Sequence, residues 1–124
     1  MRKISTGSPF ETTMGYSRAI VKGDWCFVSG VTGYDYSTMT IPDDPAEQAR
    51  NCFRTIFRVL DEAGFAPEDI VRVQYTVIDA GLVDQIIPAL GEAFGEIRPA
   101  ATMIVAGLIK PEMKIEIEVT AFRG

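Results

Sequence analysis

The sequence contains no histidine and only two cysteines, Cys26 and Cys52, among its 124 residues. Without histidine, a serine–histidine triad is excluded, and so are most metal sites. Cys26 falls in a strand-like pattern and Cys52 in a helical one, so we expect both to be buried thiols. We expect no bound metal and no cofactor.

The chain also lacks a long apolar run and a basic cluster. No stretch approaches the roughly 20 apolar residues of a membrane-spanning helix, and residues 1–7 lack the apolar stretch of a secretory signal. We therefore expect no membrane association and a cytoplasmic location. The formal net charge is −5. Phosphate binding needs clustered Lys and Arg side chains, so nucleic acid is disfavoured as a partner.

Apolar residues, in contrast, are plentiful. They make up 47% of the sequence, which is enough for a core without disulfides or metal. The length predicts a single domain over residues 1–124. Residues 1–14 are polar and interrupted by glycine and proline, and we expect an extended N-terminal arm there.

One helix is marked at both ends. Asp44 is a good N-cap, Pro45 suits the first helical position, and Glu47 would complete a capping box. Gly64 is the expected stop. Between them, apolar residues recur at helical spacing and predict a stripe that faces the core: Ala49, Cys52, Phe53, Ile56, Phe57 and Leu60.

A second helix is predicted over Leu82–Phe94, with Val83, Ile86 and Leu90 on its apolar side. Pro88 conflicts with this pattern, because proline inside a helix costs about 3 kcal/mol. Either the helix begins near Asp84 or it is kinked.

Five segments read as strands: Tyr16–Lys22, Trp25–Ser29, Ile70–Ile78, and two in the last quarter, over 98–108 and 114–122. The first two would be joined by a turn at Gly23-Asp24. Two amphipathic helices can cover only one face of a single sheet, so the order of elements predicts an α+β fold.

The uncovered sheet face would carry mixed polar residues. Period-two alternation puts Ile115, Ile117 and Val119 on the core side of the last strand and two carboxylates on the other. This face is either solvated or a subunit interface, and its mixture of charged and apolar groups favours an oligomer. Its polar members are Arg18, Arg72, Gln74, Thr76, Glu116 and Glu118.

Several short motifs between about residues 14 and 122 resemble the YjgF/RidA family. The resemblance implies a chorismate-mutase-like fold and a homotrimer with a central barrel and three clefts between subunits. Family members of the deaminase type hydrolyse enamines and imines released by pyridoxal-phosphate enzymes, whereas others have been described as ribonucleases or translation inhibitors. The motifs are Gly15-Tyr16-Ser17-Arg18-Ala19, residues 23–30, residues 60–64, Asp69-Ile70-Val71, Arg98-Pro99-Ala100 and residues 114–118.

The sequence departs from the deaminase pattern at the substrate clamp. Deaminase members have an arginine where this chain has Ala101, and alanine offers nothing in place of a bidentate guanidinium. An asparagine common in the second helix is replaced near Ile87, and the proline that usually precedes Tyr16 is absent.

Glu116 occupies the family's acid position and is the predicted catalytic residue, because a desolvated glutamate suits acid–base chemistry. Its alternative role is a salt bridge with Arg18 or Arg72. The resemblance places the ligand, a small molecule, against Tyr16, Arg18, Ser29, Gly30, Ala101 and Thr102.

Each of these contacts has a plainer alternative. Tyr16 could be a core residue, and Thr102 a simple strand former. Arg18 replaces the family's common glutamine and either enters the cleft or pairs with an acid. Tyr34 and Tyr36 either line the cleft mouth or lie on the surface.

Three classes of function remain. The first is a divergent hydrolase for a small metabolite that lacks the carboxylate bound by the arginine of deaminase members. The second is a non-catalytic ligand-binding or regulatory trimer. A ribonuclease fits least, given the acidic charge and the absence of histidine.

Overall fold

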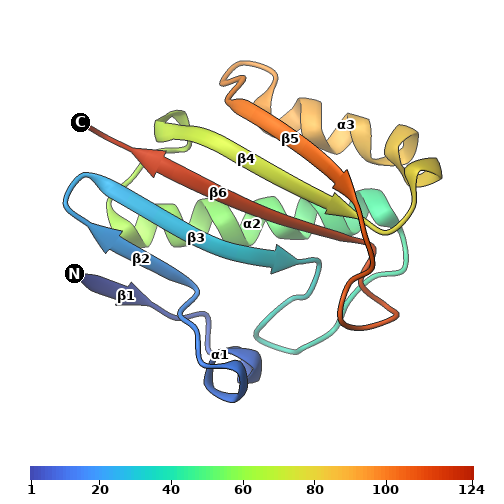
Figure 1. Cartoon of the computed structure of the whole chain (residues 1–124), viewed down its shortest axis with the longest axis horizontal. Coiled ribbons are helices and arrows are strands. Elements are labelled where there is room, and N and C mark those ends of the chain that lie inside the picture. Colours follow the sequence, from blue (N-terminus) through green and yellow to red (C-terminus); the bar gives the residue numbers. More distant parts are fainter.

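The computed structural model describes residues 1–124, and its centre is a mixed sheet of six strands in the order β1-β2-β3-β6-β4-β5. Two helices, α2 and α3, lie on one face of this sheet (Figure 1). The strands are β1 (Arg2–Ile4), β2 (Ala19–Lys22), β3 (Trp25–Thr32), β4 (Ile70–Val77), β5 (Ala100–Val105) and β6 (Ile115–Phe122).

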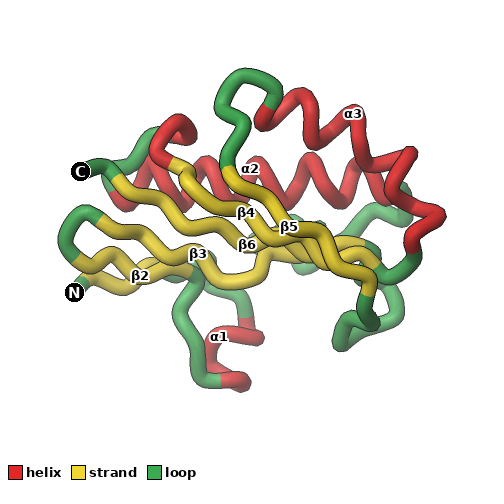
Figure 2. Tube along the Cα trace, turned by 45° about the horizontal axis from the view of Figure 1, so that its top comes forward, coloured by secondary structure: helices red, strands yellow, loops and turns green.

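All neighbouring strands are antiparallel except β4 and β5, which run parallel. A parallel pair needs a long crossover, and α3 provides it. In the tilted view of Figure 2, both long helices remain on the same side of the sheet. The predicted α+β fold, with two helices covering one face, is confirmed.

The predicted ends of α2 (Pro45–Ala63) are confirmed. The Asp44 side chain accepts a hydrogen bond from the Glu47 amide at 3.2 Å, and Gly64 ends the helix in the left-handed region with φ of 83°. The Glu47 carboxylate does not complete a capping box. It contacts Arg50 at 2.6 Å instead, because an arginine one turn along is a stronger partner for a charge than a backbone amide.

The second predicted helix is α3 (Val83–Phe94), preceded by a 3₁₀ turn, η2 (Ala80–Leu82). It begins one residue before Asp84, close to the first alternative, and Pro88 still lies within it. Another short 3₁₀ turn, η1 (Pro67–Asp69), leads into β4.

The prediction of an extended arm over residues 1–14 is wrong. β1 pairs with β2, and a short helix, α1 (Pro9–Met14), follows. The Ser8 hydroxyl caps α1 by accepting from the Phe10 amide at 3.2 Å, and Pro9 takes the first helical position. Serine followed by proline is a helix-start signal, and here it marks a helix rather than an interruption of an extended arm.

Several strand predictions need correction. β3 continues to Thr32 rather than ending at Ser29, and β5 ends at Val105 rather than near residue 108. β2 begins at Ala19 rather than Tyr16. Alternation along β4 predicts that Val71 shares one face with Val73, Tyr75 and Val77. The register with β6 shifts between Ile70 and Arg72 instead, so Ile70 is buried whereas Val71 is exposed. An irregularity of this kind changes which face a side chain occupies, and simple alternation does not reveal it.

The core lies between the sheet and the helices and contains 28 buried apolar residues. Alternation along β6 is confirmed, since Ile115, Ile117 and Val119 are all buried. Both cysteines are buried and free, as predicted. No helix has the length and apolar character needed to cross a membrane.

Gly33 and Gln48 join α2 to the end of β3. A Cβ on Gly33 would lie 2.5 Å from the Cβ of Gln48, so only glycine permits this approach. The fully buried Gln48 amide donates to the carbonyls of Pro42 and Glu112 and accepts from the Lys114 amide. One side chain thus ties α2 to the segments that flank it.

Candidate functional site

The candidate site is built on an irregularity in β3. Val28 pairs with Val119 and Val31 with Ile117, so three steps on β3 oppose two on β6. Ser29 and Gly30 form this bulge. Because a bulge interrupts the ladder, their carbonyl groups need other hydrogen-bond donors.

Arg18 supplies those donors. One guanidinium nitrogen, Nη1, donates to the Gly30 carbonyl at 2.8 Å and to the Ser29 hydroxyl at 3.2 Å, with the Ser29 carbonyl at 3.5 Å. In return, the Ser29 amide and hydroxyl both donate to the Arg18 carbonyl at 3.0 Å. Arg18 has no exposed surface. The guanidinium therefore holds the bulge in place from inside.

Aromatic rings complete the surroundings of Arg18. Its Cζ lies 4.8 Å from the centroid of the Tyr36 ring and 5.6 Å from that of Tyr16. Such cation–π contacts contribute about 0.5–2 kcal/mol. No carboxylate lies within salt-bridge distance, so the predicted pairing of Arg18 with an acid is wrong. Its Nε is buried without a partner.

The Glu116 carboxylate lies directly against the bulge. A Cβ on Gly30 would come within 2.6 Å of the Glu116 Cδ, so the missing side chain makes room for the carboxyl group. Glu116 forms no salt bridge, and the alternative role predicted for it is not observed. Burial raises the pKa of the Glu116 carboxyl, Glu118 raises it further, and Arg18 opposes both.

Two tyrosines expected at a cleft mouth or on the surface are buried instead, and the prediction of exposure is wrong. The Tyr36 hydroxyl accepts from the Thr32 amide at 3.0 Å, beneath the guanidinium of Arg18. The Tyr34 hydroxyl donates to Glu112 at 2.8 Å. Sequence analysis missed Thr32 as a neighbour of the site. Thr32 pairs directly with Glu116 across β3 and β6.

Ala101 and Thr102 lie elsewhere, on the exposed edge strand β5. Thr102 pairs with Gln74, and Gln74 pairs with Glu118, which lies opposite the bulge. β5 is thus three strand spacings from β3, or about 14 Å. One chain brings together Tyr16, Arg18, Ser29, Gly30 and Glu116 but not Ala101 or Thr102.

The sheet face next to the bulge is hollowed. A cavity of about 310 Å³ is lined by Ser29, Arg72 and Glu118, among others. A larger hollow of about 380 Å³ lies beside α2, and Glu116 lines neither of the two. Size alone would favour the larger hollow, but the desolvated carboxylate makes the bulge the better candidate for acid–base chemistry. No three side chains of the His, Cys, Asp or Glu type are grouped to hold a metal ion.

The fold defines a small α+β domain in which an acid faces a β-bulge, and comparison with known proteins gives its family. The family model described as Endoribonuclease L-PSP matches residues 6–123. The crystal structure of Rv2704 from Mycobacterium tuberculosis, described as a member of the YjgF/YER057c/UK114 family, is 36% identical, covers 98% of each chain and has a TM-score of 0.89.

Two further proteins are similar to this chain, one in sequence and one in fold. The uncharacterized protein SCO2049 of Streptomyces coelicolor is 31% identical over 100% of this chain and 93% of its own length. The E. coli TdcF structure with bound serine is 23% identical, has a TM-score of 0.83 and covers 99% of this chain and 94% of its own. The chain belongs to the YjgF/RidA family.

Proposed function

We propose that this protein is a homotrimer that binds a small metabolite in clefts between subunits and hydrolyses an imine, enamine or related group there. The supporting observation is the Glu116 carboxylate, which is desolvated, unpaired and held against Gly30. Glu116 is half-buried, partial desolvation of a carboxylate without an ion pair is unfavourable, and such groups concentrate at functional sites.

The separation of the site residues supports a cleft between subunits. The bulge cluster and β5 lie on the same sheet but too far apart to contact one ligand. β5 is an edge strand with exposed Ile104 and Val105, and a bare apolar edge readily pairs with another chain. In our proposal, β5 of one subunit faces the bulge of the next.

Glu116 is assigned the acid–base role. A carboxylate with a raised pKa can take a proton from water as that water attacks the C=N carbon. The tetrahedral intermediate then loses the nitrogen as ammonia after proton return, and a carbonyl product remains. Each turnover consumes one water and one imine and releases one carbonyl compound and one ammonia.

Ala101 defines the substrate class. Without a guanidinium on β5, that strand offers no clamp for a carboxylate, and Arg18 is enclosed with Nη1 bound to the bulge and Nη2 directed to the Tyr16 hydroxyl. We therefore assign the cleft a neutral ligand. TdcF, which has the same fold, has been solved with bound serine, and this supports a ligand of comparable size.

The test is a coupled assay in which an amino-acid oxidase supplies 2-imino acids. We expect little acceleration over solvent hydrolysis for these carboxylate substrates, because losing a charged contact of this kind costs roughly 2–5 kcal/mol. Neutral imines should be hydrolysed faster, and Glu116→Gln should abolish that activity. Robust turnover of 2-imino acids by the wild type would contradict the neutral cleft.

A non-catalytic binding protein is the second candidate, and the replacement of the clamp by Ala101 favours it. Crystals soaked with neutral metabolites would then show density beside Glu116, whereas Glu116→Gln would alter binding without removing any turnover. A ribonuclease is disfavoured by the net charge of −5 and the absence of histidine.

A further inference from the structure

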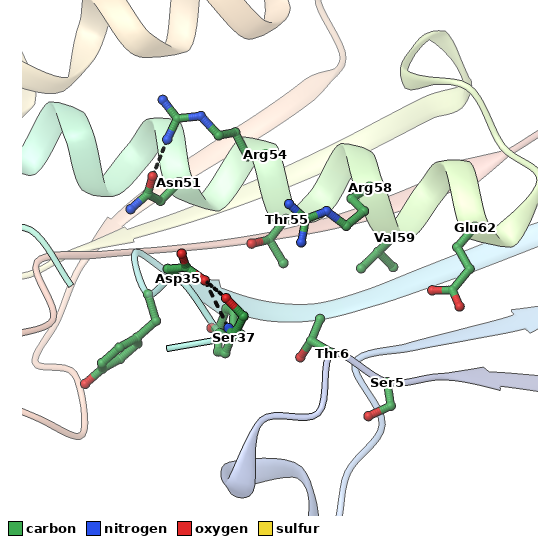
Figure 3. A pocket seen from close by; sticks show the side chains of 12 residues that line it. Ser5, Thr6, Asp35, Ser37, Asn51, Arg54, Thr55, Arg58, Val59 and Glu62 are labelled. Atoms are coloured by element: carbon green, nitrogen blue, oxygen red, sulfur yellow. Dashed lines mark hydrogen bonds between the residues drawn. The ribbon is translucent and has the colours of Figure 1, made fainter. Parts of the chain in front are cut away.

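A second hollow, larger than the cavity beside the bulge, lies beside α2, away from Glu116. It has a volume of about 380 Å³ and is bounded by α2, by Ser5 and Thr6 after β1, and by the loop over residues 34–37. Figure 3 shows α2 side chains above it, with Asp35 and Ser37 across from them. A cavity of this size suits a metabolite-sized ligand.

Two arginines from one side of α2 line this hollow, one helical turn apart. Arg58 forms no salt bridge, and its side chain extends along the helix toward Thr55 (Figure 3). Arg54 donates only to the Asn51 side chain. Neither guanidinium is neutralised by a carboxylate within contact distance.

Arg50, on the same helix, is paired with acids. Its guanidinium contacts Glu47 at 2.6 Å and Glu92 at 3.0 Å. In a chain with net charge −5, acids are available for pairing, yet the arginines of the hollow have none. Arg2, Arg72 and Arg98 also form no salt bridge, but Arg54 and Arg58 line the same hollow together, and this places two unneutralised cations beside one cavity.

The acids around the hollow restrict which anion can bind. Asp35 is occupied locally, since its carboxylate accepts from the Ser37 amide at 3.0 Å and hydroxyl at 2.6 Å. These bonds, with a smaller contribution from Arg58, lower the pKa of Asp35. Glu62 lies at the far end, toward Ser5 (Figure 3). A compact anion can avoid Glu62, whereas an extended polyanion would be repelled by it.

We infer that this hollow is a second binding site, in which Arg58, assisted by Arg54 and the Thr55 hydroxyl, holds the phosphate or carboxylate group of a small metabolite. The planar guanidinium fork suits either group. The inference is independent of the chemistry proposed for Glu116, because the two sites share no acid or base.

Calorimetric titration with inorganic phosphate, and separately with acetate, tests the site at constant ionic strength, since salt screens exposed charges. We expect saturable binding of at least one of the two anions. The preferred anion identifies the group that the site takes. Arg58→Gln should weaken binding by about tenfold or more, and Arg54→Gln should weaken it less.

Two variants serve as controls. Arg50→Gln removes a paired arginine of the same helix and should leave the affinity within about twofold. Glu116→Gln should leave it unchanged, so failure of the proposed hydrolysis would not affect this result. Absence of saturable binding of both anions, or binding that persists in the Arg54→Gln/Arg58→Gln double variant, would overturn the inference. Both arginines are exposed, so the variants are expected to fold.

Discussion

The bulge of β3 and the edge strand β5 differ in how far their backbone polar groups find hydrogen-bond partners within one chain. At the bulge, the Gly30 carbonyl and the Ser29 amide and hydroxyl all form hydrogen bonds with Arg18 of the same chain. At β5, Ala101, Thr102 and Ile104 are exposed and the outer edge is unpaired. In the proposed site, the bulge is therefore the half that one chain completes, and β5 is the half that needs a second chain.

This difference indicates where stability and specificity reside. Changes at the bulge should affect folding and the position of Glu116 together. Changes at β5 should leave the single chain stable and act on what binds to it. The predictions below use this division, from the largest expected effect to the smallest.

Arg18→Met should cost about 3 kcal/mol or more of unfolding free energy, because it leaves buried carbonyls of Ser29 and Gly30 without donors. Urea denaturation measures the loss. Arg72→Met, which removes an exposed arginine from the same sheet, is the control and should change stability by less than about 0.5 kcal/mol. Equal effects of the two variants would show that Arg18 does not hold the bulge.

Ala101→Arg should restore a carboxylate clamp on β5. We expect the rate with 2-imino acids to rise about thirtyfold, equivalent to about 2 kcal/mol, with little change in stability because Ala101 is exposed. Ala100→Arg places the same side chain on the opposite face of the strand and should give no gain. If both variants gain activity equally, a non-specific charge effect is responsible.

Gly30→Ala should displace the Glu116 carboxylate, which lies 2.6 Å from the position of the new methyl group. Because the carboxylate is the free end of a flexible side chain, we expect a loss of stability of only about 1 kcal/mol. Turnover or ligand binding should nevertheless be lost. Gly107→Ala, where nothing lies within 4 Å, is the matched control. Retained function in Gly30→Ala would show that the position of Glu116 does not matter for the site.

The regular helices and strands were predicted better from the sequence than the bulge was. Asp44, Pro45 and Gly64 marked the ends of α2, and alternation along β6 identified the carboxylate face. The role of Arg18 could not be predicted, because its acceptors are carbonyls exposed by a bulge that no hydropathy pattern shows. The burial of Tyr36 follows from the same cluster. Helix α1 was not predicted, although Ser8 and Pro9 are typical of a helix start. The register shift near Val71 was not predicted either, because the sequence alternates regularly there.

The smallest predicted effect is a pH dependence from Glu116. Its pKa is raised in the folded protein, so the folded state binds this proton more tightly than the unfolded chain does. The free energy of unfolding should therefore fall as the pH rises from the ordinary carboxyl range through the raised pKa. Glu116→Gln should remove this decline, whereas Glu68→Gln, at an exposed position, should keep it. If the decline persists in Glu116→Gln, the pH dependence comes from another titratable group.

The claim that two chains complete one site is tested most directly by cross-linking between chains. Tyr16→Cys and Thr102→Cys are prepared separately, mixed to allow subunit exchange, and treated with a short bis-maleimide. The native cysteines are buried, and each chain carries only one new thiol, so any linked pair must join two molecules. We expect a cross-linked dimer in the mixture and little in either variant alone. No linked species, with both thiols freely labelled and a monomer mass by light scattering, would contradict a site shared between subunits.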